Sequence, residues 1–319
     1  MLDELTRAQA GMVTRAQAMR CGLSDAAISA RVASGRWQRI YLGVFATFSG
    51  PLPRIASIWA AILFAGPDAI ACNRTAAELI GLVEPASGPV QVAVPHARRV
   101  RSRPGVAVHR VVDVGRMRHP AAVPPRTCVE ETVLDLAQSA RTVDDAIGWL
   151  TRAVGGRFTT PDRLRAAMAG RRRLRWRREL ASALRDVAAG CHSLLELRYR
   201  RNVERSHGLP AGTRQRRREN WYDDVAYDEY GVNVELDGRR AHPESARFRD
   251  HRRDNAAVVA GERVLRYGYA DVVERPCTVA REVATVLRDA GWRGRTRRCG
   301  PGCDDGEILP GVSLEEFPR

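Results

Sequence analysis

The side chains with the clearest capacity for chemistry are acids in the segment 221–238. Two runs rich in β-branched and aromatic residues flank residues 228–231, which is typical of a β-hairpin. Pairing of Tyr227 with Val232 across this hairpin places Asp224 opposite Glu235 on the same face. Directly opposed carboxylates repel each other unless a cation lies between them. The pattern therefore predicts a site for a divalent metal ion.

A third acid extends the predicted site. Asp237 follows Glu235 by two positions, so its side chain projects from the same side of the strand. The opposite face of this strand is apolar and consists of Val232, Val234 and Leu236. Oxygen ligands with room for water favour Mg²⁺ or Mn²⁺. The alternative is a solvated hairpin face on which the acids are incidental.

These acids need a scaffold, and the surrounding sequence predicts one. A helix is expected from Ser193 to about Glu204, followed by a short strand near 214–217 and then the hairpin. Further helices are expected over about 245–260 and from 276 to about 290, with a strand over 263–267 between them. The predicted order is thus helix, three strands, helix, strand, helix.

This arrangement is similar to the PD-(D/E)XK nuclease core, and within it to domains related to very short patch repair endonucleases. The resemblance covers residues 191 to about 290. It rests on Leu194-Leu195-Glu196, Asp224-Val225-Ala226-Tyr227, Glu235-Leu236-Asp237-Gly238, Ala241-His242, Phe248, Asp250, Arg253-Asp254 and the segment 261–266. It implies a restriction-endonuclease-like αβββαβα fold and metal-dependent hydrolysis of DNA phosphodiesters.

The same resemblance implies roles for single residues. Asp224 matches the metal-binding aspartate on the second strand of the nuclease pattern, and Glu235 matches the acidic residue on the third. Glu196 matches the helix glutamate. Asp237 stands where the nuclease pattern usually has lysine. A carboxylate at this position cannot supply the positive charge that a lysine places near the attacking water or the scissile phosphate.

Residues after the hairpin are candidates for the function of that lysine. His242, Arg253 or a second metal ion would substitute for it. In the implied mechanism a bound cation orients water and polarises the phosphoryl oxygen, while His242 assists proton transfer. The alternatives are that His242 is a structural hydrogen-bonding residue and that Arg253 forms a local ion pair with Asp254.

The first fifty residues predict a separate nucleic-acid interface. Thr14 to Gln17 has the capping-box pattern of a helix start, and Ser24 is placed to cap a second helix that ends at Gly35. A short hairpin over 37–46 follows. Helix, turn, helix, hairpin is the winged-helix order, in which the second helix enters the major groove. The candidate DNA contacts are Ser29, Arg31, Arg36 and Arg39. The alternative is a small helical domain that packs only on its own chain.

Residues 11–18, 35–41 and 43–46 resemble the N-terminal winged-helix domain of AbiEi-type antitoxins. The similarity continues through the segment 72–82, where the family usually has serine in place of Cys72, and covers residues 1 to about 170. The resemblance implies binding to double-stranded DNA, repression of the protein's own operon and neutralisation of a nucleotidyltransferase-type toxin.

The segment between these two regions predicts a buried helix and two strands. The helix covers 55–63 and is apolar almost all round, while 90–94 and 106–111 alternate with period two. Arg98 and Arg99 lie in the loop between the strands and are candidate phosphate contacts. The alternative is a solvated loop. Residues 171–178 contain six arginines and predict either a surface that faces DNA or the face of a linker.

Composition supports a polyanionic partner. The 319 residues include 52 basic and 37 acidic side chains, for a net charge of +15, and every one of the basic residues is arginine. Without lysine the chain cannot form a Schiff base or a Walker-type phosphate loop. The seven cysteines are an odd number and are expected to be reduced. Cys299 and Cys303 are close in sequence, but no Cys-His pair lies near them, so the sequence by itself favours no zinc site.

The sequence as a whole predicts an α+β multidomain protein of the cytoplasm. The expected parts are a winged helix over 1–50, a mixed α/β segment over 51–190, an endonuclease-like domain over 191–292 and a disordered tail over 293–319. Three functions follow as hypotheses. The chain is a DNA-targeted, metal-dependent endonuclease, an autorepressor whose nuclease-like domain is inactive, or a defence or repair protein that acts on invading or mismatched DNA.

Overall fold

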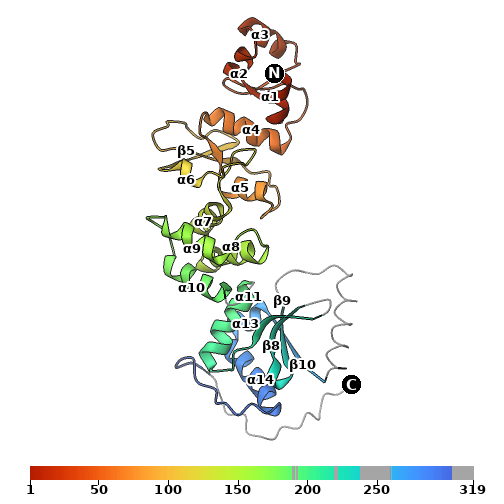
Figure 1. Ribbon diagram of the computed structural model, residues 1–319, viewed down its shortest axis with the longest axis vertical. Coiled ribbons are helices and arrows are strands. Elements are labelled where there is room, and N and C mark those ends of the chain that lie inside the picture. Colours follow the sequence, from red (N-terminus) through yellow and green to blue (C-terminus); the bar gives the residue numbers. More distant parts are fainter. Residues whose placement is uncertain (189–190, 192, 219–221, 238–258, 260, 304–319) are drawn as a thin grey trace. The chain divides into compact units, whose positions relative to one another are not determined.

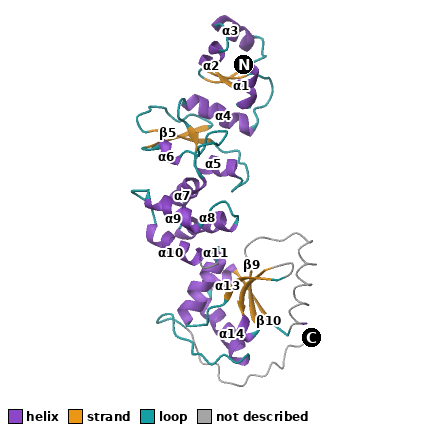
Figure 2. Cartoon of the chain, viewed as in Figure 1, coloured by secondary structure: helices purple, strands orange, loops and turns teal. Residues whose placement is uncertain are grey.

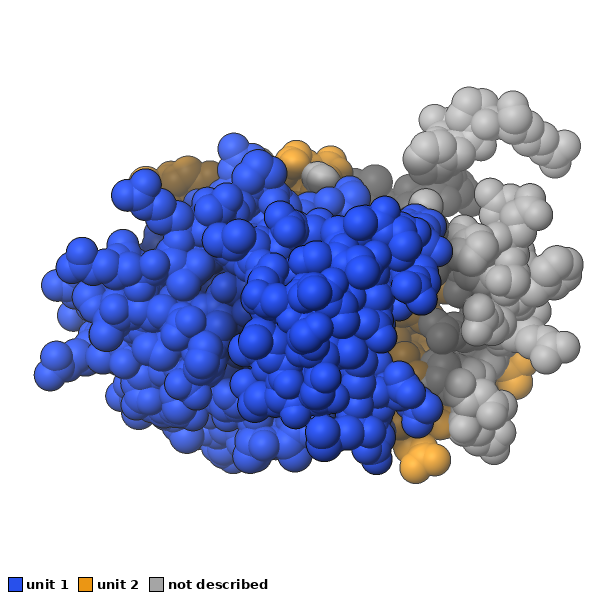
Figure 3. Space-filling view, turned by 90° about the horizontal axis from the view of Figure 1, so that it is seen from above, with its two compact units in different colours: residues 1–181 blue, residues 182–319 orange. Residues whose placement is uncertain are grey.

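The computed structural model describes residues 1–188, 191, 193–218, 222–237, 259 and 261–303. The chain divides into two compact units, residues 1–181 and 182–319 (Figure 3). Both units combine helices with small sheets, which confirms the predicted α+β class (Figure 2). The division by compactness falls after Ala181. The finer predicted division into four segments stays a prediction.

The N-terminal part of the first unit is a three-stranded antiparallel sheet with three short helices (Figure 1). Its elements are α1 (Leu2–Ala8), β1 (Met12–Thr14), α2 (Arg15–Arg20), α3 (Asp25–Ala33), β2 (Gln38–Tyr41) and β3 (Val44–Ala46). The strand order is β1-β3-β2. The predicted helix, turn, helix and hairpin are therefore present, and α1 and β1 precede them.

Local capping sets the two predicted helices. Thr14 accepts a hydrogen bond from the amide of Gln17, whose side chain accepts one from the Thr14 amide, so the capping box predicted for α2 is confirmed. Ser24 accepts a hydrogen bond from the Ala27 amide at the start of α3. Gly35 has a φ of 71°, which a glycine adopts without strain, and it follows the end of α3. A small core lies beneath these elements and consists of Val13, Ala18, Ile28, Trp37 and Phe45.

The next part of the first unit contains the buried helix and the two strands that the sequence predicts. Its elements are α4 (Arg54–Ala65), β4 (Ile70–Ala71), α5 (Asn73–Ile80), β5 (Val90–Pro95), β6 (Val106–Val111) and α6 (Val114–Met117). The strand order is β4-β5-β6, and β5 and β6 run parallel. The loop between them therefore crosses over, because a tight hairpin joins only antiparallel strands.

The first unit ends in helices. They are α7 (Val129–Ser139), α8 (Val143–Gly155), α9 (Pro161–Ala169) and the start of α10 (Arg177–Ala188), which continues into the second unit. Side chains in the arginine run 171–178 bond to this helical part. Arg175 donates to the Ala140 carbonyl at 3.1 Å and Arg177 to the Met168 carbonyl at 2.7 Å. The run is thus not a uniform DNA-facing surface, because part of it stabilises its own chain.

The second unit is a mixed sheet with helices on one face (Figure 1). Its described elements are α11 (Leu194–Arg198), η1 (Tyr199–Arg205), β7 (Thr213–Arg217), β8 (Tyr222–Tyr227), η2 (Asp228–Tyr230), β9 (Val232–Asp237), β10 (Arg263–Gly268), α13 (Tyr269–Glu274) and α14 (Pro276–Asp289). The strand order is β10-β9-β8-β7, with β9 and β10 parallel and the other pairs antiparallel. Apolar side chains of β8 and β9 pack against η1, α13 and α14.

The segment after α14 differs from the prediction of a disordered tail that begins at residue 293. Residues 293–303 form no helix or strand, yet they pack on the second unit. The Arg297 amide donates to the His207 carbonyl at 2.9 Å, and Arg288 donates to the Thr296 hydroxyl at 3.2 Å. The Cys303 side chain is buried. Residues 304–319 lie outside the described residues.

The helices in the described part of the chain can be compared with the length and composition of membrane spans. None of its helices combines the length and apolar character that a transmembrane span requires.

Candidate nucleic-acid interface and carboxylate site

The hairpin register is the one that the sequence predicts. Tyr227 pairs with Val232, and Val225 pairs with Val234. The paired register ends there, and the Asp224 carboxylate instead accepts a hydrogen bond from the Leu236 amide at 2.8 Å. This bond fixes Asp224 against the neighbouring strand at the end of the hairpin ladder.

Gln215 joins two of the predicted acids. Its side-chain amide donates to Glu196 Oε1 at 3.2 Å and to Asp224 Oδ1 at 3.3 Å. Glu196 lies on α11, where Ser193 caps the helix through the Glu196 amide, and its side chain is buried. Gln215 has a φ of 49°, an unusual conformation for a residue other than glycine. This bridge is not predictable from the sequence, because a lone glutamine in a strand has no distinctive spacing.

Glu235 has a partner that sequence reasoning missed. Its Oε2 accepts a hydrogen bond from Arg266 Nε at 3.1 Å, and Arg266 is the residue that pairs with it on the parallel strand β10. Asp237 ends β9 and is exposed. In the part of the chain that the structure describes, these hairpin acids do not gather into a metal-sized group of three or more. The magnesium or manganese site therefore stays a prediction.

Two arginines bind Asp223, the acid next to Asp224 in the sequence. Arg216 and Arg218 both donate to Asp223 Oδ2, from Nε atoms at 2.9 and 2.8 Å. Both guanidinium groups also contact Glu262, just before β10. Arginine forks thus hold Asp223, the acid adjacent to the predicted metal ligand, and fasten β7 and β8 to the start of β10.

Two predicted site residues cannot be placed. His242 and Arg253 lie outside the described residues, as does the helix predicted over about 245–260. Their proposed catalytic and DNA-binding roles stay predictions.

The predicted DNA contacts of the N-terminal part lie on α3 and at the start of the hairpin. Ser29, Arg36 and Arg39 are exposed. Arg36 Nε donates to the Ser34 hydroxyl at 3.1 Å, just beyond the end of α3. Arg31 is half-buried, with its guanidinium 5.6 Å from the centre of the Trp37 ring and a hydrogen bond of 3.2 Å to the Ala27 carbonyl. Arg31 is therefore partly engaged with its own chain, whereas Arg36 and Arg39 present charge to solvent.

The N-terminal part is similar to a known family. Residues 1–47 match the family described as transcriptional regulator, AbiEi antitoxin. The match ends after β3 and covers the whole set of elements from α1 onward. It supports the antitoxin resemblance over those residues, and we refer to them as the antitoxin-like segment. A search of curated proteins finds no match to this chain.

The predicted arginine loop lies outside the antitoxin-like segment. Arg98 donates to the Ala65 carbonyl at 2.6 Å, which holds its guanidinium against the end of α4. Arg99 is exposed. Of the two, only Arg99 is exposed, and its contact with phosphate stays a prediction, whereas Arg98 holds the loop against α4.

The first unit also contains a pocket, whose polar lining includes Cys72, His109 and Asp135. Burial raises the pKa of the Cys72 thiol well above its ordinary value, which keeps the sulfur protonated and a poor nucleophile. Arg171 holds Asp135 Oδ1 at 2.7 Å. Asp135 is therefore engaged in an ion pair with Arg171.

Proposed function

We propose that the chain is a DNA-binding transcriptional regulator of the antitoxin type. The observation that carries this proposal is the family match over residues 1–47 together with the element order of that segment. The order of helices and strands supports a winged helix, in which α3 would enter the major groove and the hairpin β2–β3 would be the wing. The proposed ligand is double-stranded DNA, and a toxin, of nucleotidyltransferase type, is the proposed protein partner.

Charge placement supports the DNA part of the proposal. The chain has a net charge of +15, so association with a polyanion is electrostatically favoured. Arg36 follows α3, and Arg39 projects from β2, so both lie where a winged helix contacts the backbone phosphates. Ser29 is exposed on α3 and is placed to contact a base edge or a phosphate.

The double variant Arg36→Ala, Arg39→Ala is expected to bind the DNA upstream of its own gene about 10-fold or more weakly. Loss of two phosphate contacts should also reduce the slope of log K against log salt by roughly 2. Titration of the full chain on labelled duplex at several salt concentrations measures both quantities. The matched control is Arg141→Ala, Arg185→Ala, which removes the same charge from exposed positions outside both the antitoxin-like segment and the arginine run 171–178. Equal losses in the two double variants would contradict the proposal.

A second candidate function, DNA phosphodiester hydrolysis, is favoured by one contact. Gln215 links Glu196 to Asp224, so the helix acid and the strand acid of the nuclease pattern approach a common side chain. With Glu235 on the neighbouring strand these acids would hold Mg²⁺ or Mn²⁺. The cation would orient water and polarise the phosphoryl oxygen, and His242 is the proposed proton-transfer group.

Asp224→Asn is expected to reduce nicking of supercoiled DNA by at least about 10-fold in the presence of Mg²⁺ or Mn²⁺, because it removes a ligand charge. Asp228→Asn is the control, since Asp228 is half-exposed in η2 at the other end of the hairpin. The assay uses the full chain, with and without a chelator. Nicking that survives Asp224→Asn, or that does not depend on a divalent ion, would exclude this second function and leave the regulator.

A further inference from the structure

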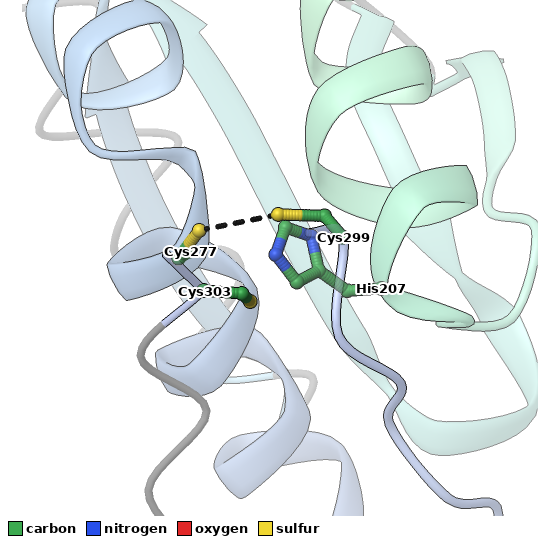
Figure 4. Close-up of side chains that lie close together, drawn as sticks. All are labelled: His207, Cys277, Cys299 and Cys303. Carbon is green, nitrogen blue, oxygen red and sulfur yellow. Dashed lines mark hydrogen bonds between the residues drawn. The ribbon is translucent and has the colours of Figure 1, made fainter. Parts of the chain in front are cut away.

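Four side chains from distant parts of the sequence meet in the second unit. They are His207, Cys277, Cys299 and Cys303, and their ligand atoms all lie within 4.8 Å of one another (Figure 4). His207 lies just after η1, Cys277 is the second residue of α14, and the other two cysteines belong to the segment after α14. Within the described residues, no other group of His, Cys, Asp or Glu side chains has this geometry.

The histidine of this cluster has one nitrogen without a hydrogen-bond partner. His207 is 2 % exposed, and its Nδ1 lies 3.0 Å from the Val203 carbonyl. A carbonyl accepts only, so Nδ1 carries the proton and the Nε2 lone pair is available as an acceptor or a ligand. Nε2 is buried and has no hydrogen-bond partner. A buried polar atom without a partner costs free energy unless something satisfies it, and ring nitrogens that bind metals are oriented in this way by a carbonyl at the other nitrogen.

The sulfur atoms fit a metal better than a disulfide. Cys277 Sγ and Cys299 Sγ are 3.5 Å apart, whereas a disulfide bond requires about 2.0 Å. Around a tetrahedral zinc ion with Zn–S bonds of about 2.3 Å, two sulfurs are separated by about 3.8 Å. The spacing of Cys299 and Cys303 also falls within the two to four intervening residues that are typical of zinc ligands.

We propose that His207, Cys277, Cys299 and Cys303 bind one structural Zn²⁺ ion. Three thiolates and one imidazole complete a tetrahedral shell and leave no position open for water or substrate, which is the property of a structural site. Thiolate ligands favour zinc over Mg²⁺ and Ca²⁺, which prefer oxygen. The site is separate from the hairpin acids and does not depend on either function proposed above.

The position of the ligands explains what the ion would do. Residues 293–303 form no helix or strand, and their described contacts to the unit include the hydrogen bond from Arg297 to the His207 carbonyl. Zinc would fasten this segment to the end of η1 through His207 and to the start of α14 through Cys277. A closed loop held by a metal stabilises the folded state because the site does not exist in the unfolded chain.

The experiment measures zinc in the full-length protein, purified under reducing conditions without chelators and then incubated with Zn²⁺ and desalted. The expected content is about one zinc per chain by mass spectrometry of the metal. Cys277→Ser and Cys303→Ser should each reduce it to below about a tenth, while Cys21→Ser, a free cysteine of the first unit, should leave it unchanged. Substitution by Co²⁺ should give the absorption of a tetrahedral thiolate complex, with weaker sulfur-to-metal charge transfer in a variant that lacks one cysteine.

Hydrogen exchange makes the test independent of whether a variant folds poorly. Chelation of zinc from the wild-type chain should speed exchange in residues 203–212 and 293–303, and leave the antitoxin-like segment unchanged. A wild-type protein that retains no zinc after this loading would overturn the proposal. So would a Cys277–Cys299 disulfide in the reduced preparation, or full zinc content in both the Cys277→Ser and Cys303→Ser variants.

Discussion

Replacing Arg214 with methionine is expected to lower the free energy of unfolding of the second unit by about 3 to 5 kcal/mol. The Arg214 side chain is 5 % exposed, and its ion-pair partner Glu204 is 4 % exposed. Methionine fills a similar volume but leaves the Glu204 carboxylate without a cation in the core. An unpaired buried charge costs several kcal/mol, far more than a surface ion pair contributes.

Glu204 also accepts hydrogen bonds from neutral donors, which do not replace the charge of Arg214. Its Oε1 accepts hydrogen bonds from the Tyr227 hydroxyl at 2.9 Å and the Gly212 amide at 3.2 Å. The Tyr227 hydroxyl lies 3.0 Å from that of Tyr199, which is fully buried. These neutral donors remain in the variant, so Glu204 keeps its hydrogen bonds to Tyr227 and Gly212 but loses Arg214, the cation that pairs with it in the described part of the chain.

The loss should depend on pH. Burial raises the pKa of Glu204 above its ordinary value, and Arg214 opposes that shift, so the pKa rises further when the arginine is removed. The folded state then binds a proton that the unfolded state has released, and raising the pH favours unfolding. We therefore expect the deficit of Arg214→Met to be larger at pH 8 than at pH 5.

Hydrogen exchange in the full-length chain measures this effect without assuming two-state unfolding of both units. Amides of β8, β9 and α14 should exchange roughly 150- to 5,000-fold faster in Arg214→Met than in wild type. Arg217→Met is the matched control, because Arg217 lies on the same strand and is exposed. Equal exchange rates in the two variants, or a deficit independent of pH, would refute the buried-charge explanation.

Local signals in the sequence were sufficient for the elements that position the hairpin acids. The pairing of Tyr227 with Val232 follows from the short turn between the strands, because turn length fixes register. The capping box of α2 and the N-cap of α3 each involve residues within four positions of one another, so the sequence also predicts these two helix starts. The short helix α1 and strand β1 were not predicted, since each has too few residues to establish a period.

Partners that come from distant segments could not be read from the sequence. Arg266 reaches Glu235 only because β10 lies parallel to β9, and the sequence does not specify which strand becomes the neighbour. The cysteine cluster is a second case. Cys299 and Cys303 have the spacing of metal ligands, but His207, just after η1, and Cys277, at the start of α14, join them only in the folded unit. The sequence around Cys299 and Cys303 contains no Cys-His pair, but the folded chain brings His207 and Cys277 next to them.

Arg171→Ala is expected to lower the free energy of unfolding of the first unit by about 3 kcal/mol. Arg171, in the arginine run 171–178, forms buried ion pairs with Glu131 and Asp135, and its own side chain is 11 % exposed. Its guanidinium donates to Glu131 Oε2 at 2.6 Å, to Asp135 Oδ1 at 2.7 Å and to the Glu131 carbonyl at 2.9 Å. Burial raises the pKa of Asp135, and Arg171 is the cation that most opposes this shift. Its removal leaves a carboxylate of α7 unpaired.

A neighbouring arginine separates this explanation from a general loss of positive charge. Arg172 is exposed, so Arg172→Ala changes the net charge equally but removes no buried ion pair. Glu131 keeps its contact with Arg116 at 2.5 Å in both variants, so the difference between them isolates the pairing of Arg171 with Asp135 and its bonds to Glu131. Hydrogen exchange over α7 in the full chain should therefore be roughly 100-fold faster in Arg171→Ala alone. If Arg172→Ala produced the same acceleration, the arginine run would act through its summed charge, and the assignment of Arg171 to the core of the first unit would fail.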